Sequence, residues 1–247
     1  MDAAGIVDQV GQDVTTGVKV GDRVMAMVVP RAAHGAYREQ IVLDQRAVVP
    51  APAGSSHVEA CTLPMNALTA RMSLDLLDLK PGEVIAVTGG PGAYGGYVIQ
   101  LAKADGLKVI ADGADSDRAL LKSLGADIIV SRGDGFADKI REHFPQGVDG
   151  LADGALLNAL AVDAVKDGGS FTAIRGFKGK DQRGIKFTAT WVTGYDGAYE
   201  KLDLLREQVE AGVLTLRVAG SVTPEDAGHA HQRLEQGGTR GRMVIEF

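Results

Sequence analysis

A run of closely spaced glycines, between an apolar strand and an amphipathic helix, is the part of this sequence best suited to chemistry. Val84–Val87 is a short β-prone run, and the apolar residues of 95–103 recur at helical spacing. Between them, Gly89, Gly92 and Gly95 recur at every third position. Glycine leaves room for backbone N–H groups and the positive end of a helix to approach a pyrophosphate. The pattern predicts a dinucleotide phosphate site.

The segments that follow predict the scaffold that would position this turn. They alternate between strand and helix at a spacing typical of the mononucleotide-binding half of a doubly wound sheet. The expected elements are a strand at 108–112, a helix at 116–125, and strands at 127–130 and 150–153, then a helix at 156–166 and strands at 170–174 and 187–192. We therefore expect an α/β fold, a Rossmann doubly wound parallel sheet.

Both ends of the chain have a different character. The first fifty residues are β-like and are interrupted by Gly, Pro and Asp turn signals, which favours a small β-barrel or sandwich. The expected strands are 5–10, 22–29, 40–43 and 47–50. A connector at 50–56 leads into a helix at 57–79, and a helix at 198–211 precedes a closing β segment at 242–247.

Composition excludes several classes of protein. The net charge is −6, and no basic run exceeds two residues, so no nucleic-acid partner is expected. The single cysteine, Cys61, excludes an internal disulfide and a four-cysteine zinc site, and we expect a buried apolar side chain. No apolar stretch approaches the length of a membrane span, and the amino terminus lacks a basic region. We expect a cytoplasmic protein with no membrane partner.

Other dinucleotide enzymes can be tested against the sequence. Short-chain dehydrogenases need a Tyr-x-x-x-Lys pair, and none of the five tyrosines has a lysine four residues later. Zinc alcohol dehydrogenases need a cysteine and histidine set that this chain lacks, so no metal is expected. His229 and His231 would point apart on a helix and are interpreted as surface residues. His34, beside a Gly-Ala-Tyr turn, stays open as a substrate contact.

Several short motifs, in this order and spacing, resemble one family. They are Asp2–Val7, Val20–Val24, Gly35–Tyr37, Leu63–Ala70, Val87–Gly96, Leu124–Asp127 and Gly238–Val244. The chain resembles the zinc-independent branch of the medium-chain dehydrogenase/reductase superfamily, which includes NADPH:quinone oxidoreductases and enoyl reductases. The resemblance covers essentially the whole chain. It implies a GroES-like catalytic domain, formed by 1–53 and 212–247, and a Rossmann NADP-binding domain at 54–211, with the cofactor between them.

The chain departs from the family at its start. Family members carry a further segment ahead of the Asp2 motif, which forms the opening strands of the catalytic domain and part of the nicotinamide and substrate pocket. Two explanations stay open. Either the true start lies upstream of Met1, or the GroES-like domain is truncated and its cleft is more open.

The resemblance also implies the site residues. Asn66 and Thr69 would border the nicotinamide end, and Ile174 to Gly176 would back the nicotinamide ring. Asn66 and Tyr37 are the candidate catalytic residues, although Tyr37 also fits a turn tyrosine that packs on the barrel. The pyrophosphate would be cradled by Gly89, Gly90, Pro91, Gly92, Ala93, Tyr94 and Gly95.

The end of the second strand bears on the choice of nucleotide. A carboxylate there binds the ribose hydroxyls of NAD, whereas the 2′-phosphate of NADPH requires a cation. In the family register this position is Gly113, and Asp112 should point to the other face. Arg118 and Arg132 follow the second and third strands and favour NADPH over NADH. Nearby aspartates oppose that preference, and Arg118 also fits a surface charge at a helix start.

Without a metal or a tyrosine and lysine pair, this architecture suits hydride transfer to a conjugated electrophile, a quinone or an α,β-unsaturated carbonyl. One alternative is a free-standing enoyl reductase acting on thioester intermediates, which Val130–Arg132 suggests by resemblance. Another is a catalytically weak NADPH-binding or sensing protein. The resemblance also implies a homodimer formed through an edge strand, for which 187–192 has the expected uncharged, β-rich character.

Overall fold

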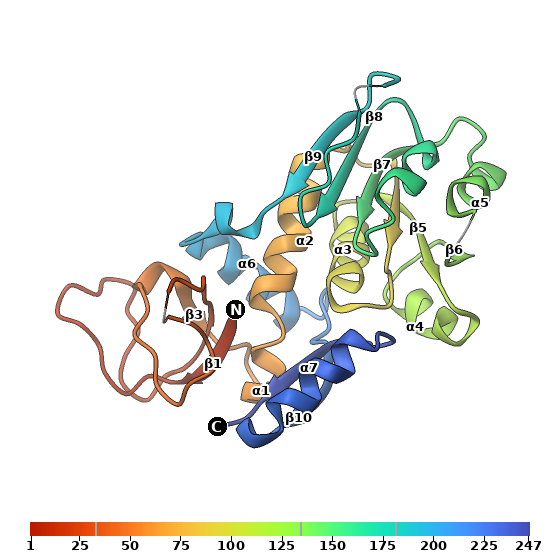
Figure 1. Cartoon of the computed structure of the whole chain (residues 1–247). Coiled ribbons are helices and arrows are strands. Elements are labelled where there is room, and N and C mark those ends of the chain that lie inside the picture. The colour runs from red at the N-terminus through yellow and green to blue at the C-terminus, as the bar shows by residue number, and fades with distance from the viewer. Residues whose placement is uncertain (33, 134, 181) are drawn as a thin grey trace. The chain divides into compact units, whose positions relative to one another are not determined.

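The computed structural model describes residues 1–32, 34–133, 135–180 and 182–247 (Figure 1). These residues group into two compact units, Thr69–Trp191 and a discontinuous unit made of Met1–Leu68 and Val192–Phe247. The sequence division placed 54–68 and 192–211 with the nucleotide-binding domain, whereas both segments group here with the discontinuous unit. The assignment of functional domains stays a prediction.

A six-stranded parallel sheet forms the centre of the Thr69–Trp191 unit (Figure 1). Its spatial order is β6-β5-β4-β7-β8-β9, the Rossmann order, which reverses between β4 and β7. The strands are β4 (Val84–Thr88), β5 (Lys108–Gly113), β6 (Ile128–Ser131), β7 (Val148–Asp153), β8 (Val165–Ile174) and β9 (Lys186–Thr190). The predicted doubly wound sheet is confirmed. Ligands of such sheets bind at the carboxyl ends of the strands beside the reversal, where Thr88 pairs with Asp153.

Helices connect most of these strands. They are α3 (Ala93–Ala104), α4 (Arg118–Ser123) and α5 (Phe136–His143). The helix predicted at 116–125 is shorter, because a 3-10 turn at Asp115–Asp117 precedes α4. Helix α5 was not predicted from the sequence.

The helix predicted at 156–166 is wrong. A 3-10 helix, Asn158–Ala164, stands there, and β8 already includes Lys166. Leu156 and Asn158 both have positive φ, +60° and +53°, which an α-helix does not accommodate. The Asp153 carboxylate accepts hydrogen bonds from the N–H groups of Leu157 and Asn158, which holds the chain in this turn.

Apolar side chains from strands and helices form one core cluster in this unit. Phe136 and Ile140 of α5 pack with Leu151 of β7 and Phe171 of β8, and all four are almost fully buried. The Phe171 ring also contacts Phe177 and Phe187, with centroid distances of 5.6 and 5.5 Å. Burial of large apolar surface on this scale is the main term that holds such a sheet and its helices together.

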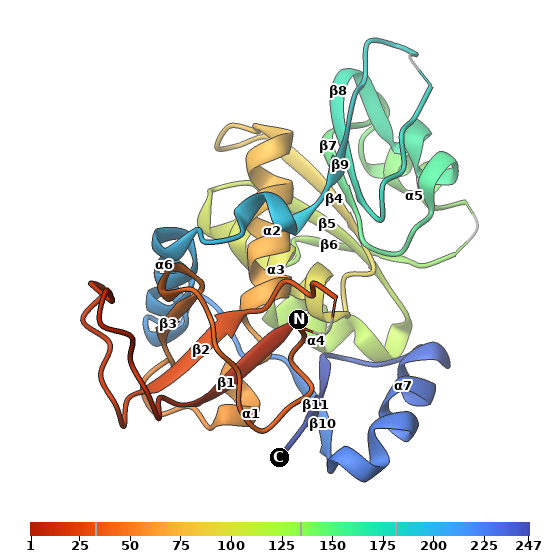
Figure 2. The ribbon, with the colours of Figure 1, turned by 60° about the vertical axis from the view of Figure 1, so that its left-hand side comes forward.

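The discontinuous unit contains two small sheets (Figure 2). One is antiparallel, with strands β1 (Asp2–Ile6), β2 (Arg23–Met27) and β3 (Val48–Pro50) in that order; the other is the parallel pair β10 (Val218–Val222) and β11 (Arg242–Ile245). The expected strand at 40–43 is wrong, since that segment is irregular and Asp44 caps a short 3-10 turn, Gln45–Ala47.

The helices of this unit are α1 (His57–Ala60), the start of α2 (Pro64–Leu77), α6 (Tyr199–Glu210) and α7 (Ala227–Glu235). The single helix predicted at 57–79 is divided into α1 and α2, and Pro64 begins the second because proline fits the first helical turn. The Asp2 carboxylate accepts hydrogen bonds from the Met65 N–H at 2.6 Å and from Arg242 at 2.8 Å. None of the helices in the described residues combines the length and apolar character needed to cross a membrane.

Candidate functional site

The glycine turn after β4 is built so that side chains are excluded from it. Gly89 has φ +69°, and a Cβ on Gly90 would lie 2.9 Å from Leu121 Cδ2. A Cβ on Gly95 would lie 2.7 Å from the carbonyl carbon of Gly89, so only glycine lets α3 start this close to the turn. Gly92 is the N-cap of α3, and no side chain caps this helix end. The turn therefore presents backbone at the positive end of a helix.

A buried carboxylate lies against the turn. Asp112 Oδ1 accepts hydrogen bonds from the N–H groups of Gly89 at 2.7 Å and Gly90 at 3.2 Å, and Asp112 is only 3% exposed. Burial raises the pKa of Asp112, and the two N–H donors partly offset this rise. Sequence reasoning considered Asp112 only for its position relative to the ribose. Its partners depend on the fold of β5 against β4, so only the predicted pairing of these strands could have signalled the contact.

A second buried carboxylate ties the ends of β4 and β7 together. The Thr88 hydroxyl donates to Asp153 and accepts from the Ala155 N–H at 3.0 Å. Neither Thr88 nor Asp153 has exposed surface. A Cβ on Gly89 would lie 3.3 Å from the Ala155 nitrogen, so the turns after β4 and β7 are in close contact at the reversal of strand order.

Tyr94 lies in the first turn of α3 and faces the interior. Its hydroxyl is 2.7 Å from Ser73 Oγ, and Ser73 is in turn 3.0 Å from Thr190 Oγ1. Thr190 Oγ1 also lies 2.7 Å from Thr172 Oγ1. Burial is the main cause that raises the pKa of Tyr94, so its hydroxyl stays protonated. Sequence reasoning assigned Tyr94 to the phosphate cradle and missed these partners.

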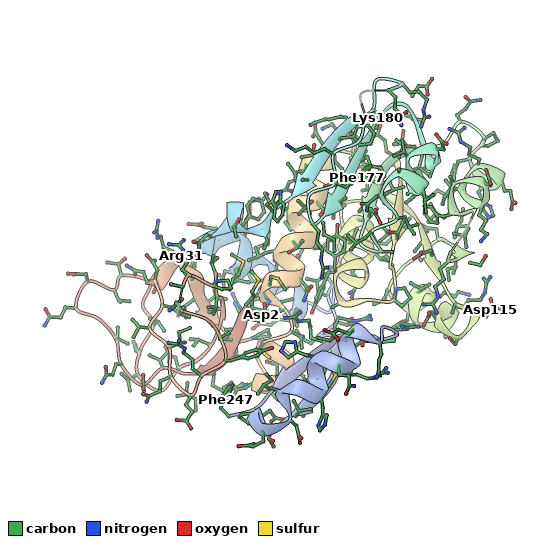
Figure 3. The ribbon with its side chains drawn as sticks, viewed as in Figure 1. Asp2, Arg31, Asp115, Phe177, Lys180 and Phe247 are labelled. Carbon is green, nitrogen blue, oxygen red and sulfur yellow. The ribbon has the colours of Figure 1, made fainter. Side chains whose placement is uncertain are left out.

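The residues predicted to choose the nucleotide lie at the end of β5 and in the segments that follow β5 and β6. A Cβ on Gly113 would lie 2.5 Å from Leu121 Cδ1, so a larger side chain there would require the Leu121 side chain to move. Arg118 at the start of α4 pairs with Asp115 at 3.0 Å, and its side chain is half-exposed. Asp115 is 93% exposed and lies at the outer surface (Figure 3). Arg132 donates its N–H to the Gly113 carbonyl at 3.2 Å, and its exposed guanidinium forms no ion pair with the described residues.

The end of β8 has an unusual backbone. Ile174 is the last residue of the strand, and Arg175 and Gly176 follow with φ +62° and +80°. A Cβ on Gly176 would lie 2.8 Å from Trp191 Cζ2, so a larger residue would have to displace the Trp191 ring, and the positive φ also favours glycine. This sharp turn lies at the carboxyl end of β8, and its role in backing the nicotinamide ring stays a prediction.

The remaining predicted residues include members of the discontinuous unit. Asn66 lies in the first turn of α2, is 9% exposed, and its Nδ2 has no partner among the described residues. Thr69 lies one turn later in the same helix. The Tyr37 hydroxyl is 3.0 Å from His231 Nε2, and Tyr37 is 61% exposed, so in this structure it pairs with α7.

His34 lines a cavity of about 380 Å³ within the discontinuous unit. The charged groups of this cavity pair with one another, Arg31 with Asp196 at 2.7 Å and Arg46 with Asp44 at 3.1 Å. In the described part of the chain, no group of three or more His, Cys, Asp or Glu side chains is arranged to hold a metal ion.

Comparisons with known proteins agree with this architecture. The family model described as zinc-binding dehydrogenase matches residues 93–196. Over 253 residues the chain is 30% identical to a 2-methylene-furan-3-one reductase from Solanum lycopersicum, and the match covers 99% of the chain and 62% of that reductase. The chain is similar to members of the medium-chain dehydrogenase/reductase superfamily over nearly its whole length, and it spans less than two thirds of that reductase.

Solved structures of the medium-chain dehydrogenase/reductase superfamily have the same fold. A quinone oxidoreductase from Pseudomonas syringae pv. Tomato DC3000 is 25% identical, with a TM-score of 0.86, over 99% of this chain and 81% of that one. A mycobacterial protein solved in complex with NADPH is 26% identical, with a TM-score of 0.85, over 99% of this chain and 81% of that one. The likeness extends over 99% of the chain and supports a nicotinamide cofactor.

Proposed function

We propose that this protein is an NADPH-dependent, zinc-independent oxidoreductase that transfers a hydride to a quinone or an α,β-unsaturated carbonyl. The observation that carries the proposal is the glycine turn between β4 and α3, at the reversal of strand order in a Rossmann sheet. The reductase and quinone oxidoreductase to which the chain is similar support the same class of acceptor.

The turn fits a pyrophosphate. Added Cβ atoms at Gly90 and Gly95 would collide with neighbouring atoms, so the backbone packs more closely than other residues permit. The first turn of α3 has no side-chain cap, which leaves its N–H groups for a ligand anion. We assign the segment from Gly89 to Gly95 to the pyrophosphate on these grounds.

NADPH is our choice over NADH. Gly113 places no carboxylate at the end of β5, and Asp112 is buried and already bonded to the turn. Arg118 and Arg132 supply positive charge in this region, and a 2′-phosphate would compete with Asp115 for Arg118. The similarity to a protein solved with NADPH supports the same choice.

When bound, the nicotinamide supplies the hydride, and the protein's own groups bind and orient. Asn66 has a buried Nδ2 with an unused hydrogen-bond donor, which suits a carbonyl or carboxamide oxygen. Thr69 follows on the same helix, and the backbone of 174–176 offers a surface at the carboxyl end of β8. Tyr37 is a weaker candidate, because its hydroxyl pairs with His231. Conjugated acceptors need little acid catalysis, so positioning supplies much of the rate.

The proposal also covers the location of the protein, its oligomeric state and its domains. We propose a cytoplasmic homodimer that acts on a small electrophile, with 1–53 and 212–247 as the catalytic domain and 54–211 as the nucleotide-binding domain. An enoyl reductase acting on thioesters is the second candidate, because Ser131 ends β6 and Arg132 follows it, as the sequence resemblance implies.

The test is direct. Purified protein is mixed with NADPH and 1,2-naphthoquinone, and the loss of nicotinamide absorbance is followed, with NADH and with an enoyl thioester in parallel. We expect oxidation with the quinone and a preference for NADPH. Faster turnover of the thioester would favour the second candidate. Tight NADPH binding without oxidation of any acceptor would refute the proposed enzymatic activity and would favour a nucleotide-binding or sensing protein.

A further inference from the structure

A chain of four buried hydroxyls runs from the glycine turn to the edge strand of the sheet. It passes from Tyr94 to Ser73, then to Thr190 and Thr172, with oxygen separations of 2.7, 3.0 and 2.7 Å. All four side chains are buried, and Ser73 and Thr172 have no exposed surface. The chain therefore links α3, α2, β9 and β8 within the Thr69–Trp191 unit.

The positions of the protons follow from counting donors. Ser73 donates its hydroxyl hydrogen to the Thr69 carbonyl at 2.9 Å. A serine hydroxyl has one hydrogen and two lone pairs, so Ser73 accepts from both Tyr94 and Thr190. Thr190 has then spent its hydrogen on Ser73 and accepts from Thr172. The Ser73 hydroxyl oxygen is therefore the acceptor for two buried donors, the hydroxyls of Tyr94 and Thr190.

The ring of Tyr94 is also held in place, by close packing against Gly154. A Cβ on Gly154, directly after β7, would lie 2.6 Å from Tyr94 Cδ1. Tyr94 is the second residue of α3, so its side chain fastens the first turn of that helix to α2 through Ser73 and to the turn after β7 through Gly154. The N–H groups of this first turn are the ones assigned above to the pyrophosphate.

We propose that Tyr94, Ser73 and Thr190 are positioning residues that hold the first turn of α3 in its nucleotide-binding orientation and thereby set nucleotide affinity. The inference rests on the proposed nucleotide site. The three side chains do not contact the nucleotide through their hydroxyls, since these are buried and engaged with one another. They act through the backbone of the turn.

Donor counting predicts a graded series. Ser73→Ala leaves two buried donors without an acceptor and should weaken NADPH binding about tenfold. Tyr94→Phe removes one donor and leaves Ser73 its other partner, so we expect a loss of about threefold to fivefold. Thr172→Val leaves the bond from Thr190 to Ser73 intact and should change binding less than about twofold. Thr190→Val should weaken binding, and Thr190→Ser, which keeps the hydroxyl, should restore it.

Two measurements test the series. Amide hydrogen exchange over 89–97 is measured in the nucleotide-free protein, and the dissociation constant for NADPH is measured by fluorescence titration. Ser73→Ala and Tyr94→Phe should speed exchange of this segment in the same order in which they weaken binding. The matched control is Ile140→Val, which removes one methylene from the apolar core and should lower stability without changing either readout.

The outcomes separate the inference from the proposed function. Equal effects across the series, or effects no larger than those of Ile140→Val, would overturn the positioning role. Faster exchange with unchanged affinity would overturn the link to nucleotide binding. Failure of the unmodified protein to bind NADPH would instead refute the proposed function, and the exchange series would still decide whether Ser73 holds the turn.

Discussion

The Asp112 carboxylate accepts a hydrogen bond from the Gly89 N–H at 2.7 Å, so a buried charge from β5 holds the first residue of the glycine turn after β4. The same oxygen accepts from Gly90 at 3.2 Å. Three N–H groups of the turn are therefore used inside the protein, because the Gly92 N–H also donates to the Gly89 carbonyl at 3.0 Å, and a bound phosphate would have to rely on those that follow Gly92. The Asp112 carboxylate shapes the turn, but its negative charge also repels a bound phosphate.

Asp112→Asn should raise the free energy of unfolding at neutral pH. Burial raises the pKa of Asp112 in the folded protein, so the ionised form is less favourable there than in the unfolded chain. The stability of the unmodified protein therefore falls as pH rises from the unfolded pKa, near 3.8, through the higher folded pKa. Asparagine keeps an oxygen for the two N–H groups and has no such dependence. Urea unfolding at several pH values measures the difference, which should shrink in acid.

Asp115→Asn is the control for this pH dependence, because Asp115 is 93% exposed and should change stability very little. We also expect Asp112→Asn to bind NADPH a few times more tightly, since it removes a negative charge beneath the proposed phosphate site. A lower stability of Asp112→Asn across the whole pH range would show that the charged hydrogen bonds outweigh the cost of burial.

Gly95→Ala should destabilise the protein and abolish nucleotide binding. The added Cβ would lie 2.7 Å from the Gly89 carbonyl carbon, and both groups belong to backbone that cannot move independently. We expect a loss of about 3 kcal/mol, the upper end for overpacking. Thermal unfolding and NADPH titration measure the two effects.

Gly228→Ala is the matched control for Gly95→Ala. Gly228 lies in α7, and an added Cβ there would meet nothing within 4 Å. It should gain up to about 0.5 kcal/mol, because alanine favours the helix. If Gly95→Ala unfolds at the same temperature as the unmodified protein, the close approach of turn and helix is not a constraint.

The sequence predicted the parallel sheet well because its strands are continuous apolar runs bounded by turn residues. The strand beginning at Val84 and the order of β4, β5 and β6 follow directly from such runs. The helix expected at 156–166 failed because its conformation is decided by the Asp153 carboxylate at the start of the segment. Nothing in the local apolar pattern records that contact.

The candidate site likewise has features that the sequence predicted and contacts that it did not. Glycine spacing predicts the phosphate turn, since the steric requirement is local to the chain. The partners of Asp112 and Tyr94 could not be predicted, because each is separated from its partner by about twenty residues or more and meets it only through packing of the sheet. Long-range hydrogen bonds of buried side chains depend on tertiary structure, which a single sequence does not display.

Arg118→Ala should weaken NADPH binding about tenfold and leave NADH nearly unchanged, because a 2′-phosphate gains a charge-assisted hydrogen bond that a hydroxyl does not need. Arg118 is half-exposed, and among the residues that the structure describes its one ion pair is with Asp115, which a phosphate could displace. Fluorescence titration with both nucleotides measures the ratio. Lys122→Ala, a charge change on the same helix, is the control and should alter both nucleotides alike. Equal weakening by Arg118→Ala would show that Arg118 is only a surface charge.

Strand β9 should join two copies of the protein. It is the edge of the sheet and pairs with β8 on one side, so among the described residues its other side offers unpaired backbone groups to a second β9. Sedimentation should therefore give twice the mass of the chain. Thr188→Lys places a positive charge on each of two facing strands and should shift the protein to the monomer. Val42→Lys is the control, because Val42 is 90% exposed and lies outside the sheet, and this variant should remain dimeric. A monomer for the unmodified protein, at concentrations well above those of the assay, would contradict pairing through β9.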